Sequence, residues 1–77
     1  MPYCVTAVPV VSSNIDRVGH HDDTLFIAFH HGGVYAYAAV PHSIFVALLD
    51  AESVGRFFHA NIKGKFDFKK LDNDPFI

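Results

Sequence analysis

The 77-residue sequence has a single cysteine, Cys4, and no long hydrophobic run. One cysteine excludes an intrachain disulfide, and no apolar stretch approaches the roughly 18 residues that would suggest a membrane span. The N-terminus also lacks a basic region followed by a continuous apolar segment, which is the pattern of a signal peptide. We therefore expect a soluble cytoplasmic protein that has no membrane partner.

The residue patterns of common enzyme active sites are missing as well. Cys4 is close to an end of the chain that we expect to be loose, without a helix N-terminus or nearby cations to activate its thiol. The Gly32-Gly33 pair precedes a predicted strand, whereas a phosphate-binding loop precedes a helix. Asp22 and Asp23 adjoin in a predicted turn and act as turn formers. We therefore predict a non-enzymatic protein without catalytic residues or a cofactor.

Hydrophobic residues, in contrast, make up 51% of the chain, and aromatic residues make up 14%. A chain this short forms one domain, which buries only about 60% of the surface that its unfolded chain exposes. The sequence thus holds more apolar material than one small core needs, and self-association is one way to cover the surplus. We therefore expect a homo-oligomer.

Residues 25–39 predict a β-hairpin with two apolar faces. The Gly32-Gly33 pair indicates the turn, because glycine adopts a positive φ without penalty. A loop that contains both glycines would place Phe29 opposite Tyr35 in an aromatic cross-strand pair. One layer of helices covers only one face, so we predict that the other face is an interface with a second copy or a partner. Its residues are Phe26, Ala28, Val34, Ala36 and Ala38.

The segments before the hairpin also read as extended. Pro9 cannot donate a hydrogen bond within a sheet, so residues 1–10 predict an arm or an edge strand. Residues 15–21 predict a short strand that joins the hairpin in a three-stranded meander. At the other end of the chain, residues 72–77 predict a frayed tail.

After the hairpin the spacing of apolar residues changes to that of helices. Pro41 is typical of a first helical turn, Ser53 predicts the N-cap of a second helix, and Gly64 predicts its end. Residues 65–71 alternate again and predict a last strand that returns to the meander. The sequence therefore predicts a small α+β domain, in which two short helices cover one face of an antiparallel sheet.

The charges of the chain are separated along the sequence. Five of the six basic residues lie between positions 56 and 70, where Asp67 is the only acid, so this segment has a net charge of +4 while the whole chain has −2. Such a segment attracts anions. Lys69 and Lys70 have a simpler alternative role, because lysines keep an edge strand soluble. The predicted anion-binding residues are Arg56, His59, Asn61, Lys63 and Lys65.

Six histidines raise the question of a metal site. They are His20, His21, His30, His31, His42 and His59. Zinc needs three or four ligands that converge within about 2.0–2.3 Å of one point. Neighbouring residues of a strand point to opposite faces, so neither adjacent pair can supply both rings to one site. We therefore interpret the histidines as surface residues near loops and predict no metal site.

Tyr35 and Tyr37 have two interpretations. Aromatic residues on a sheet stack on nucleic-acid bases, at about 1–3 kcal/mol per base. The same side chains also suit the core beneath the helices, with each hydroxyl reaching the rim. The sequence favours the core and leaves the ligand-binding role open.

Several short motifs occur in a recognisable order along residues 11–71. They include Val11-Ser12-Ser13-Asn14-Ile15, Gly33-Val34-Tyr35-Ala36-Tyr37, Ala51-Glu52-Ser53-Val54-Gly55 and Ile62-Lys63-Gly64-Lys65-Phe66. This order resembles the KTSC domain, which is named for the C-terminus of certain lysyl-tRNA synthetases and also occurs in stand-alone bacterial and phage proteins. The resemblance implies a similar fold and, from the synthetase context, RNA binding. The family tail is often rich in arginine and tyrosine, whereas residues 65–70 carry lysines and Asp67, which weakens phosphate binding.

Two functions follow as hypotheses. The first is a self-associating, non-enzymatic module that binds an anionic ligand, either single-stranded RNA or another nucleic acid, or a nucleotide. The second is a protein-interaction module that docks on a host protein through the apolar outer face, for example as a phage-encoded inhibitor. A phage protein that sequesters a nucleotide from a host system would combine the two.

Overall fold

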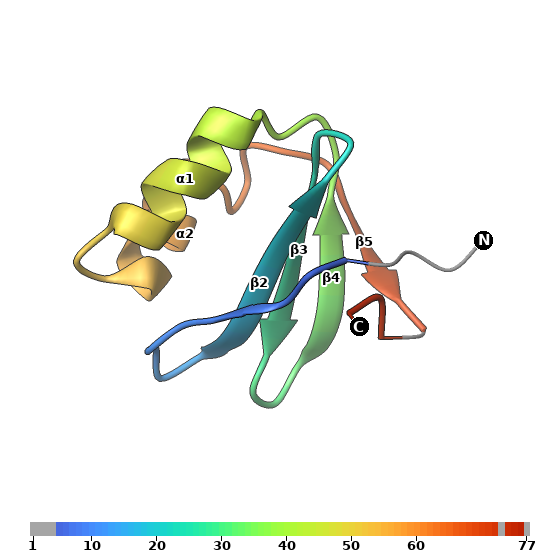
Figure 1. Ribbon diagram of the computed structural model, residues 1–77, viewed down its shortest axis with the longest axis horizontal. Coiled ribbons are helices and arrows are strands. Elements are labelled where there is room, and N and C mark those ends of the chain that lie inside the picture. Colours follow the sequence, from blue (N-terminus) through green and yellow to red (C-terminus); the bar gives the residue numbers. More distant parts are fainter. Residues whose placement is uncertain (1–4, 73, 77) are drawn as a thin grey trace.

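The computed structural model describes residues 5–72 and 74–76, so the prediction about Cys4 lies outside the described residues. The elements follow in the order β1 (Val8–Pro9), β2 (Ile15–His21), β3 (Thr24–Phe29), β4 (Gly33–Tyr37), α1 (His42–Asp50), α2 (Val54–Asn61) and β5 (Phe68–Leu71). The strands form one antiparallel sheet in the order β1-β2-β3-β4-β5 (Figure 1). This is the predicted α+β fold, a meander extended by a C-terminal strand and by a short edge strand at Val8–Pro9.

The β3–β4 hairpin has a different register from the predicted one. Phe29 pairs with Gly33, and Tyr35 pairs with Ile27. The loop covers residues 30–32, and Gly33 begins the next strand with a φ of 81°. The predicted pairing of Phe29 with Tyr35 is therefore wrong by two residues. A shift of two leaves every side chain on its predicted face, because successive residues of a strand alternate between faces.

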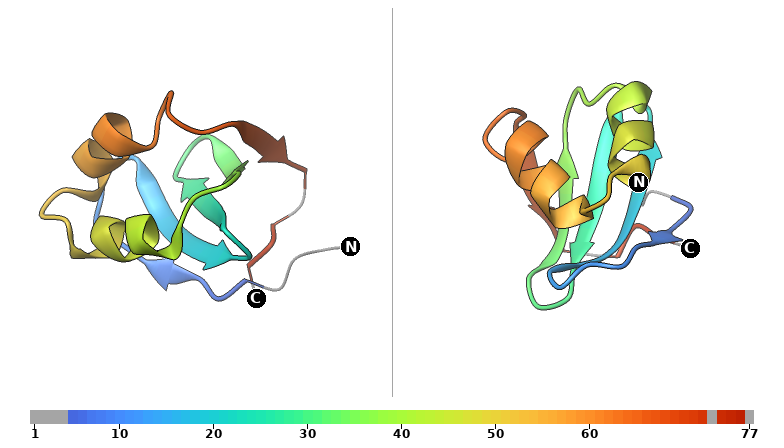
Figure 2. Two further views of the ribbon diagram at one scale, coloured as in Figure 1. Left: turned by 90° about the horizontal axis from the view of Figure 1, so that it is seen from above. Right: turned by 90° about the vertical axis from the view of Figure 1, so that its left-hand side faces the viewer.

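Both helices lie on the same side of the sheet (Figures 1 and 2). Helix α1 follows Pro41 at its N-cap, and helix α2 follows Ser53, whose Oγ accepts a hydrogen bond from the backbone N–H of Arg56 at 3.3 Å. Their apolar stripes pack on the sheet as helical spacing requires. The buried side chains of this core are Ile15, Val18, Leu25, Ile27, Tyr37, Val40, Phe45, Leu48, Val54, Phe58 and Ile62.

The opposite face of the sheet is covered by described residues near both ends of the chain, Val5 and Phe76. The Val5 N–H donates to the Pro75 carbonyl at 3.0 Å, and Val5 forms a parallel bridge with Phe76. The Phe76 ring packs edge-on against Phe26, with 6.5 Å between the ring centroids. The prediction of a frayed tail is therefore wrong for residues 74–76.

The prediction that this face is uncovered is also wrong. Phe26 is 0% exposed and Ala28 is 2% exposed, so these two predicted interface residues are buried within the chain. Val34 and Ala36 are half-buried, and Ala38 is exposed. The sequence reasoning counted helices as the only cover for a sheet, whereas short extended segments also shield apolar surface from water. Part of the apolar surplus is thus buried within the same chain, and self-association stays a prediction.

Arg17 holds the C-terminal tail in place on this face. Its guanidinium carbon lies 4.9 Å from the centroid of the Phe76 ring, and its Nη2 lies 2.5 Å from Oδ2 of Asp74. Gly19 lies beneath the same contact, because a Cβ there would come 2.9 Å from the Phe76 ring and would also clash with Val5. The absence of a side chain at Gly19 therefore lets both ends of the chain approach the sheet. Within the described residues, neither helix has the length and apolarity to cross a membrane.

Candidate functional site

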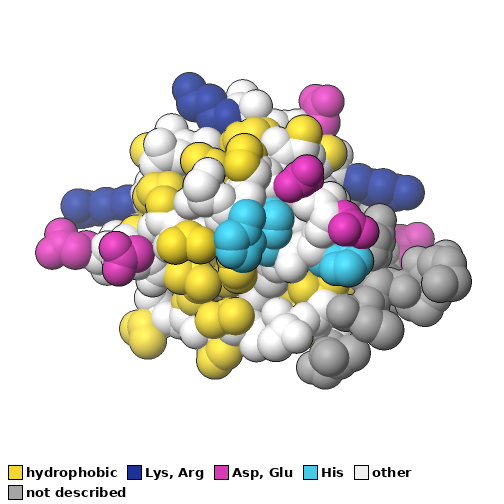
Figure 3. All heavy atoms as spheres, turned by 45° about the horizontal axis from the view of Figure 1, so that its top comes forward, with side chains coloured by type: hydrophobic (Ala, Val, Ile, Leu, Met, Phe, Trp, Pro, Cys, Tyr) yellow, Lys and Arg dark blue, Asp and Glu magenta, His cyan; other side chains and the backbone are white. Residues whose placement is uncertain are grey.

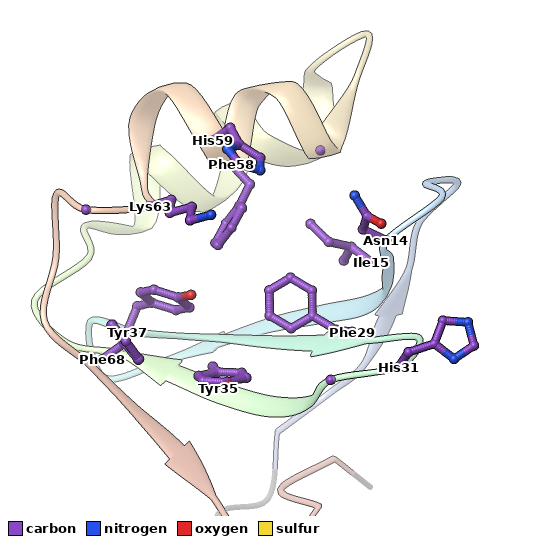
Figure 4. Close-up of a pocket in the computed structure, with 13 residues that line it drawn as sticks. Asn14, Ile15, Phe29, His31, Tyr35, Tyr37, Phe58, His59, Lys63 and Phe68 are labelled. Carbon is purple, nitrogen blue, oxygen red and sulfur yellow. The ribbon is translucent and has the colours of Figure 1, made fainter.

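Five aromatic side chains form a closed cycle of ring contacts between α2 and the sheet (Figure 4). In order around the cycle they are Phe29, Tyr35, Phe68, Tyr37 and Phe58, and each ring centroid lies 5.6 or 5.7 Å from the next. Strands β3, β4 and β5 supply four of the rings, and α2 supplies Phe58. The rings meet edge-on or tilted, as the charge distribution of aromatic rings favours. We call this set the aromatic cluster.

A cavity of about 450 Å³ lies against the aromatic cluster, and all five rings line it. Small-molecule sites in proteins have volumes of about 300–1,000 Å³. Its polar lining includes Asn14, His59 and Lys63. Figure 4 shows the Lys63 amino group directed toward this space and the ring of His31 pointing away from it. The cavity is thus an apolar hollow with a cation at its rim.

Phe68 forms the open side of the aromatic cluster. Its side chain is 62% exposed, whereas Phe58 and Tyr37 are each 5% exposed. Most large aromatic side chains are buried, so the exposed ring of Phe68 offers a surface on which a planar ligand can stack.

Tyr37 belongs to the core and to the cavity lining at the same time. Burial raises the pKa of its phenol above the usual 10.0, and the neighbouring Tyr35 raises this pKa further. The phenol is therefore uncharged at neutral pH and adds no negative charge to the cavity. Tyr35 and Tyr37 pack against phenylalanines, as the core interpretation expects, and they also line the cavity, so their role in ligand binding stays a prediction.

The end of helix α2 places Lys63 beside the cavity. The backbone N–H groups of Ile62 and Lys63 both donate to the Phe58 carbonyl, at 2.9 and 2.8 Å. Gly64 follows with a φ of 77°, which is the left-handed conformation typical of a helix end. The same turn of helix buries Phe58 and leaves His59 exposed, so one element supplies both an aromatic wall and polar groups.

The predicted anion-binding residues do not all come together. Lys63 and His59 line the cavity at the aromatic cluster, and Arg56 joins His59 in a second, neighbouring hollow of about 590 Å³. The Asn61 amide donates to the Phe57 carbonyl at 3.2 Å. Asn61 and Lys65 line neither hollow. The lining of the second hollow also includes Glu52 and the serines Ser12, Ser13 and Ser53.

The sequence reasoning missed Phe29, Phe58, Phe68 and Asn14 as lining residues. Phe58 belongs to the buried core, and Asn14 lies in the bend before β2, so the local pattern at neither position indicates a binding residue. Phe68 was the residue whose pattern could have revealed the site. The alternation of the last strand places it on the same face as Tyr35 and Tyr37, at an edge of the sheet that two short helices do not cover.

Two pairs of histidine rings lie near each other. The rings of the chain neighbours His30 and His31 have centroids 6.4 Å apart. His20 and His42 have their Nδ1 atoms 3.5 Å from each other, although 22 positions separate them in the chain. Across residues 5–72 and 74–76, no three or more His, Cys, Asp or Glu side chains are grouped to hold a metal ion.

Comparison with known proteins places these features in a family. The sequence model of the KTSC domain matches residues 11–66, which is most of the chain. The chain belongs to the KTSC domain family. The resemblance inferred from the order of short motifs is therefore confirmed.

Relatives of this KTSC chain include both small proteins and parts of large ones. A protein of Tsukamurella paurometabola is 40% identical over 60 residues, which cover 75% of this chain and 90% of that protein. A lysine–tRNA ligase of Nostoc punctiforme is 48% identical over 48 residues, which cover 62% of this chain. The matched part is only 9% of the ligase, so the similarity concerns one small region of that protein.

A solved KTSC structure has the same fold. The crystal structure of a KTSC domain protein from Yersinia pestis is 38% identical in sequence and matches with a TM-score of 0.84. The match covers 88% of this chain and 99% of the other. The α+β architecture predicted from the sequence is thus confirmed both by the structure and by this relative.

Proposed function

We propose that this KTSC domain is a non-enzymatic module that binds a nucleotide unit, either within single-stranded RNA or as a free nucleotide. The observation that carries the proposal is the aromatic cluster with its exposed Phe68 below a cationic rim. A base has two flat apolar faces, which stack on aromatic side chains regardless of sequence. Lys63 then lies where it neutralises the negative charge of a phosphate.

The charge at the rim determines which class of ligand the cavity favours. Aromatic rings also attract cations over their faces. However, the Lys63 amino group points toward the space, and Lys70 pairs with Tyr35 on the neighbouring strand. A cationic ligand would be repelled there. An anion with a planar ring would stack on the aromatic cluster and be attracted by the Lys63 cation at the rim.

The matches to lysine–tRNA ligases add indirect support, because an enzyme of that name acts on an RNA. The second hypothesis from the sequence, a module that docks on a host protein, rested on an uncovered apolar face. Phe26, at the centre of that face, is buried by the chain itself. The protein-interaction hypothesis therefore has no supporting surface at that position.

The first experiment measures binding of short single-stranded RNA and of free nucleotides at low and moderate salt. RNA should bind with an affinity that falls steeply with salt, because phosphate contacts release counterions. Free nucleotides should bind more weakly and with a smaller salt dependence. No binding of either ligand at low salt would refute the proposal.

Lys63→Gln tests the rim, and Lys69→Gln is the matched control. Lys69 pairs with Ala36 on β4, so it belongs to the face of the sheet opposite the aromatic cluster. Both variants remove one positive charge. Lys63→Gln should weaken RNA binding and lower the slope of log affinity against log salt by about 1, while Lys69→Gln changes both much less. Equal effects of the two variants would show that only net charge matters.

A further inference from the structure

We propose that His20 and His42 form a two-ligand site for a divalent transition-metal ion. The proposal is independent of nucleotide binding, because neither residue lines the cavity at the aromatic cluster. His20 is half-buried at the end of β2, and His42 is exposed in the first turn of α1. Figure 3 shows histidine side chains gathered in the middle of an exposed face of the molecule.

The spacing of the two rings suits ligands of one shared metal ion. The Nδ1 atoms of His20 and His42 lie 3.5 Å apart. Two nitrogens bound at about 2.0–2.1 Å to one tetrahedral ion lie about 3.3 Å from each other. A movement of about 0.2 Å brings the two nitrogens to that spacing. The exposed His42 ring is free to make this movement.

A hydrogen bond on the far side of His20 determines which of its ring nitrogens is available to an ion. Its Nε2 lies 2.7 Å from the Val40 carbonyl oxygen, which only accepts hydrogen bonds. The proton of neutral His20 is therefore on Nε2, and the lone pair of Nδ1 points toward His42. Histidines that bind metals characteristically donate their other N–H to a backbone carbonyl or carboxylate, which fixes the ring and raises its basicity.

The surroundings hold His20 in this orientation before any ion binds. Its ring stacks on Phe45, with centroids 5.5 Å apart and planes at 22°. The Val40 N–H donates to the Asp23 carbonyl at 2.7 Å, which anchors the carbonyl that His20 contacts. Without an ion, the His42 Nδ1 proton can donate to the His20 Nδ1 lone pair. With an ion, that proton moves to the solvent-facing Nε2 of His42, so both Nδ1 atoms become ligands.

Two imidazoles leave the other coordination positions to water. The expected site is therefore exchangeable and weaker than a closed structural site with four protein ligands. Imidazole ligands suit zinc, copper and nickel, and copper is the most tightly bound of these in general. A site of this kind is not visible from adjacent histidines, because 22 positions separate His20 from His42 in the chain. This pair forms only when α1 packs beside β2.

The test is calorimetric titration of the untagged protein with Zn²⁺. Wild-type protein should bind one ion per chain, and His42→Gln should weaken binding by about tenfold or more. His31→Gln is the matched control, since His31 is an exposed histidine at the far end of the hairpin, and it should leave zinc affinity unchanged. Unchanged affinity in His42→Gln, or no zinc binding by the wild type, would overturn the proposal.

A second measurement identifies the ligand atoms directly. In nitrogen-15 NMR spectra, zinc should shift the Nδ1 resonances of His20 and His42. It should also shift the Nε2 resonance of His42, which gains the proton, and leave the imidazole nitrogens of the other four histidines in place. Circular dichroism confirms that His42→Gln is folded, because the side chain is exposed. Zinc-dependent shifts centred on any other histidine would assign the ion elsewhere and refute this site.

Discussion

Replacing Phe68 by alanine tests whether the aromatic cluster is a binding surface. The ring contacts Tyr35 and Tyr37, with centroids 5.7 and 5.6 Å away, and 62% of the side chain is exposed. A base stacked on an aromatic side chain contributes about 1–3 kcal/mol. Loss of that energy raises the dissociation constant for single-stranded RNA by roughly five- to 150-fold. Because most of the ring is already in water, the free energy of unfolding should fall by only about 1 kcal/mol.

Fluorescence anisotropy with a labelled single-stranded RNA measures the affinity, and urea denaturation measures the stability of the same preparations. Val46→Ala is the matched control, because Val46 is an apolar side chain on α1 that is 51% exposed and lines neither hollow. The control should bind RNA as the wild type does. Wild-type affinity in a folded Phe68→Ala variant would refute the argument that the exposed ring stacks on a base.

Two further predictions concern stability. Phe76→Ala removes the ring that covers Phe26, so the free energy of unfolding, measured by urea denaturation, should fall by about 1–3 kcal/mol. Val11→Ala is the control. The Val11 side chain is 100% exposed, so this variant should unfold as the wild type does. An unchanged transition in Phe76→Ala would show that the tail contributes nothing. The pKa of Tyr37 is raised in the folded state. Its contribution to the free energy of unfolding is therefore fully present below about pH 10 and is lost as pH rises through the folded pKa. Above about pH 10 the free energy of unfolding should therefore fall more in the wild type than in Tyr37→Phe. An equal fall in both proteins would contradict the burial of the phenol.

Much of the fold followed from local sequence patterns. Ser53 is the N-cap of α2 as predicted, and Gly64 follows that helix with a positive φ. The alternation along the hairpin placed every side chain on its observed face, although the register was wrong by two residues. Short-range spacing determines faces because side chains alternate strictly along a strand. It determines register less well, because two neighbouring glycines offered two positions for the turn.

The candidate site was only partly accessible from the sequence. Tyr35, Tyr37, His59 and Lys63 were predicted and line the cavity, whereas Asn61 and Lys65 were predicted and do not. The error has a simple cause. Charge clustering along the chain identified a basic segment, but a helix distributes its side chains around an axis, so neighbours in sequence face different directions.

The sequence by itself determined the elements, their apolar faces and the family, because these depend on propensities, spacing and motif order within short segments. The tertiary structure alone decided three features: the covering of Phe26 by the chain ends, the closure of five aromatic rings into one cluster, and the meeting of His20 with His42. Each of these joins segments that are distant in the chain. Their contacts arise from the packing of whole elements on one another, which no local pattern of residues encodes.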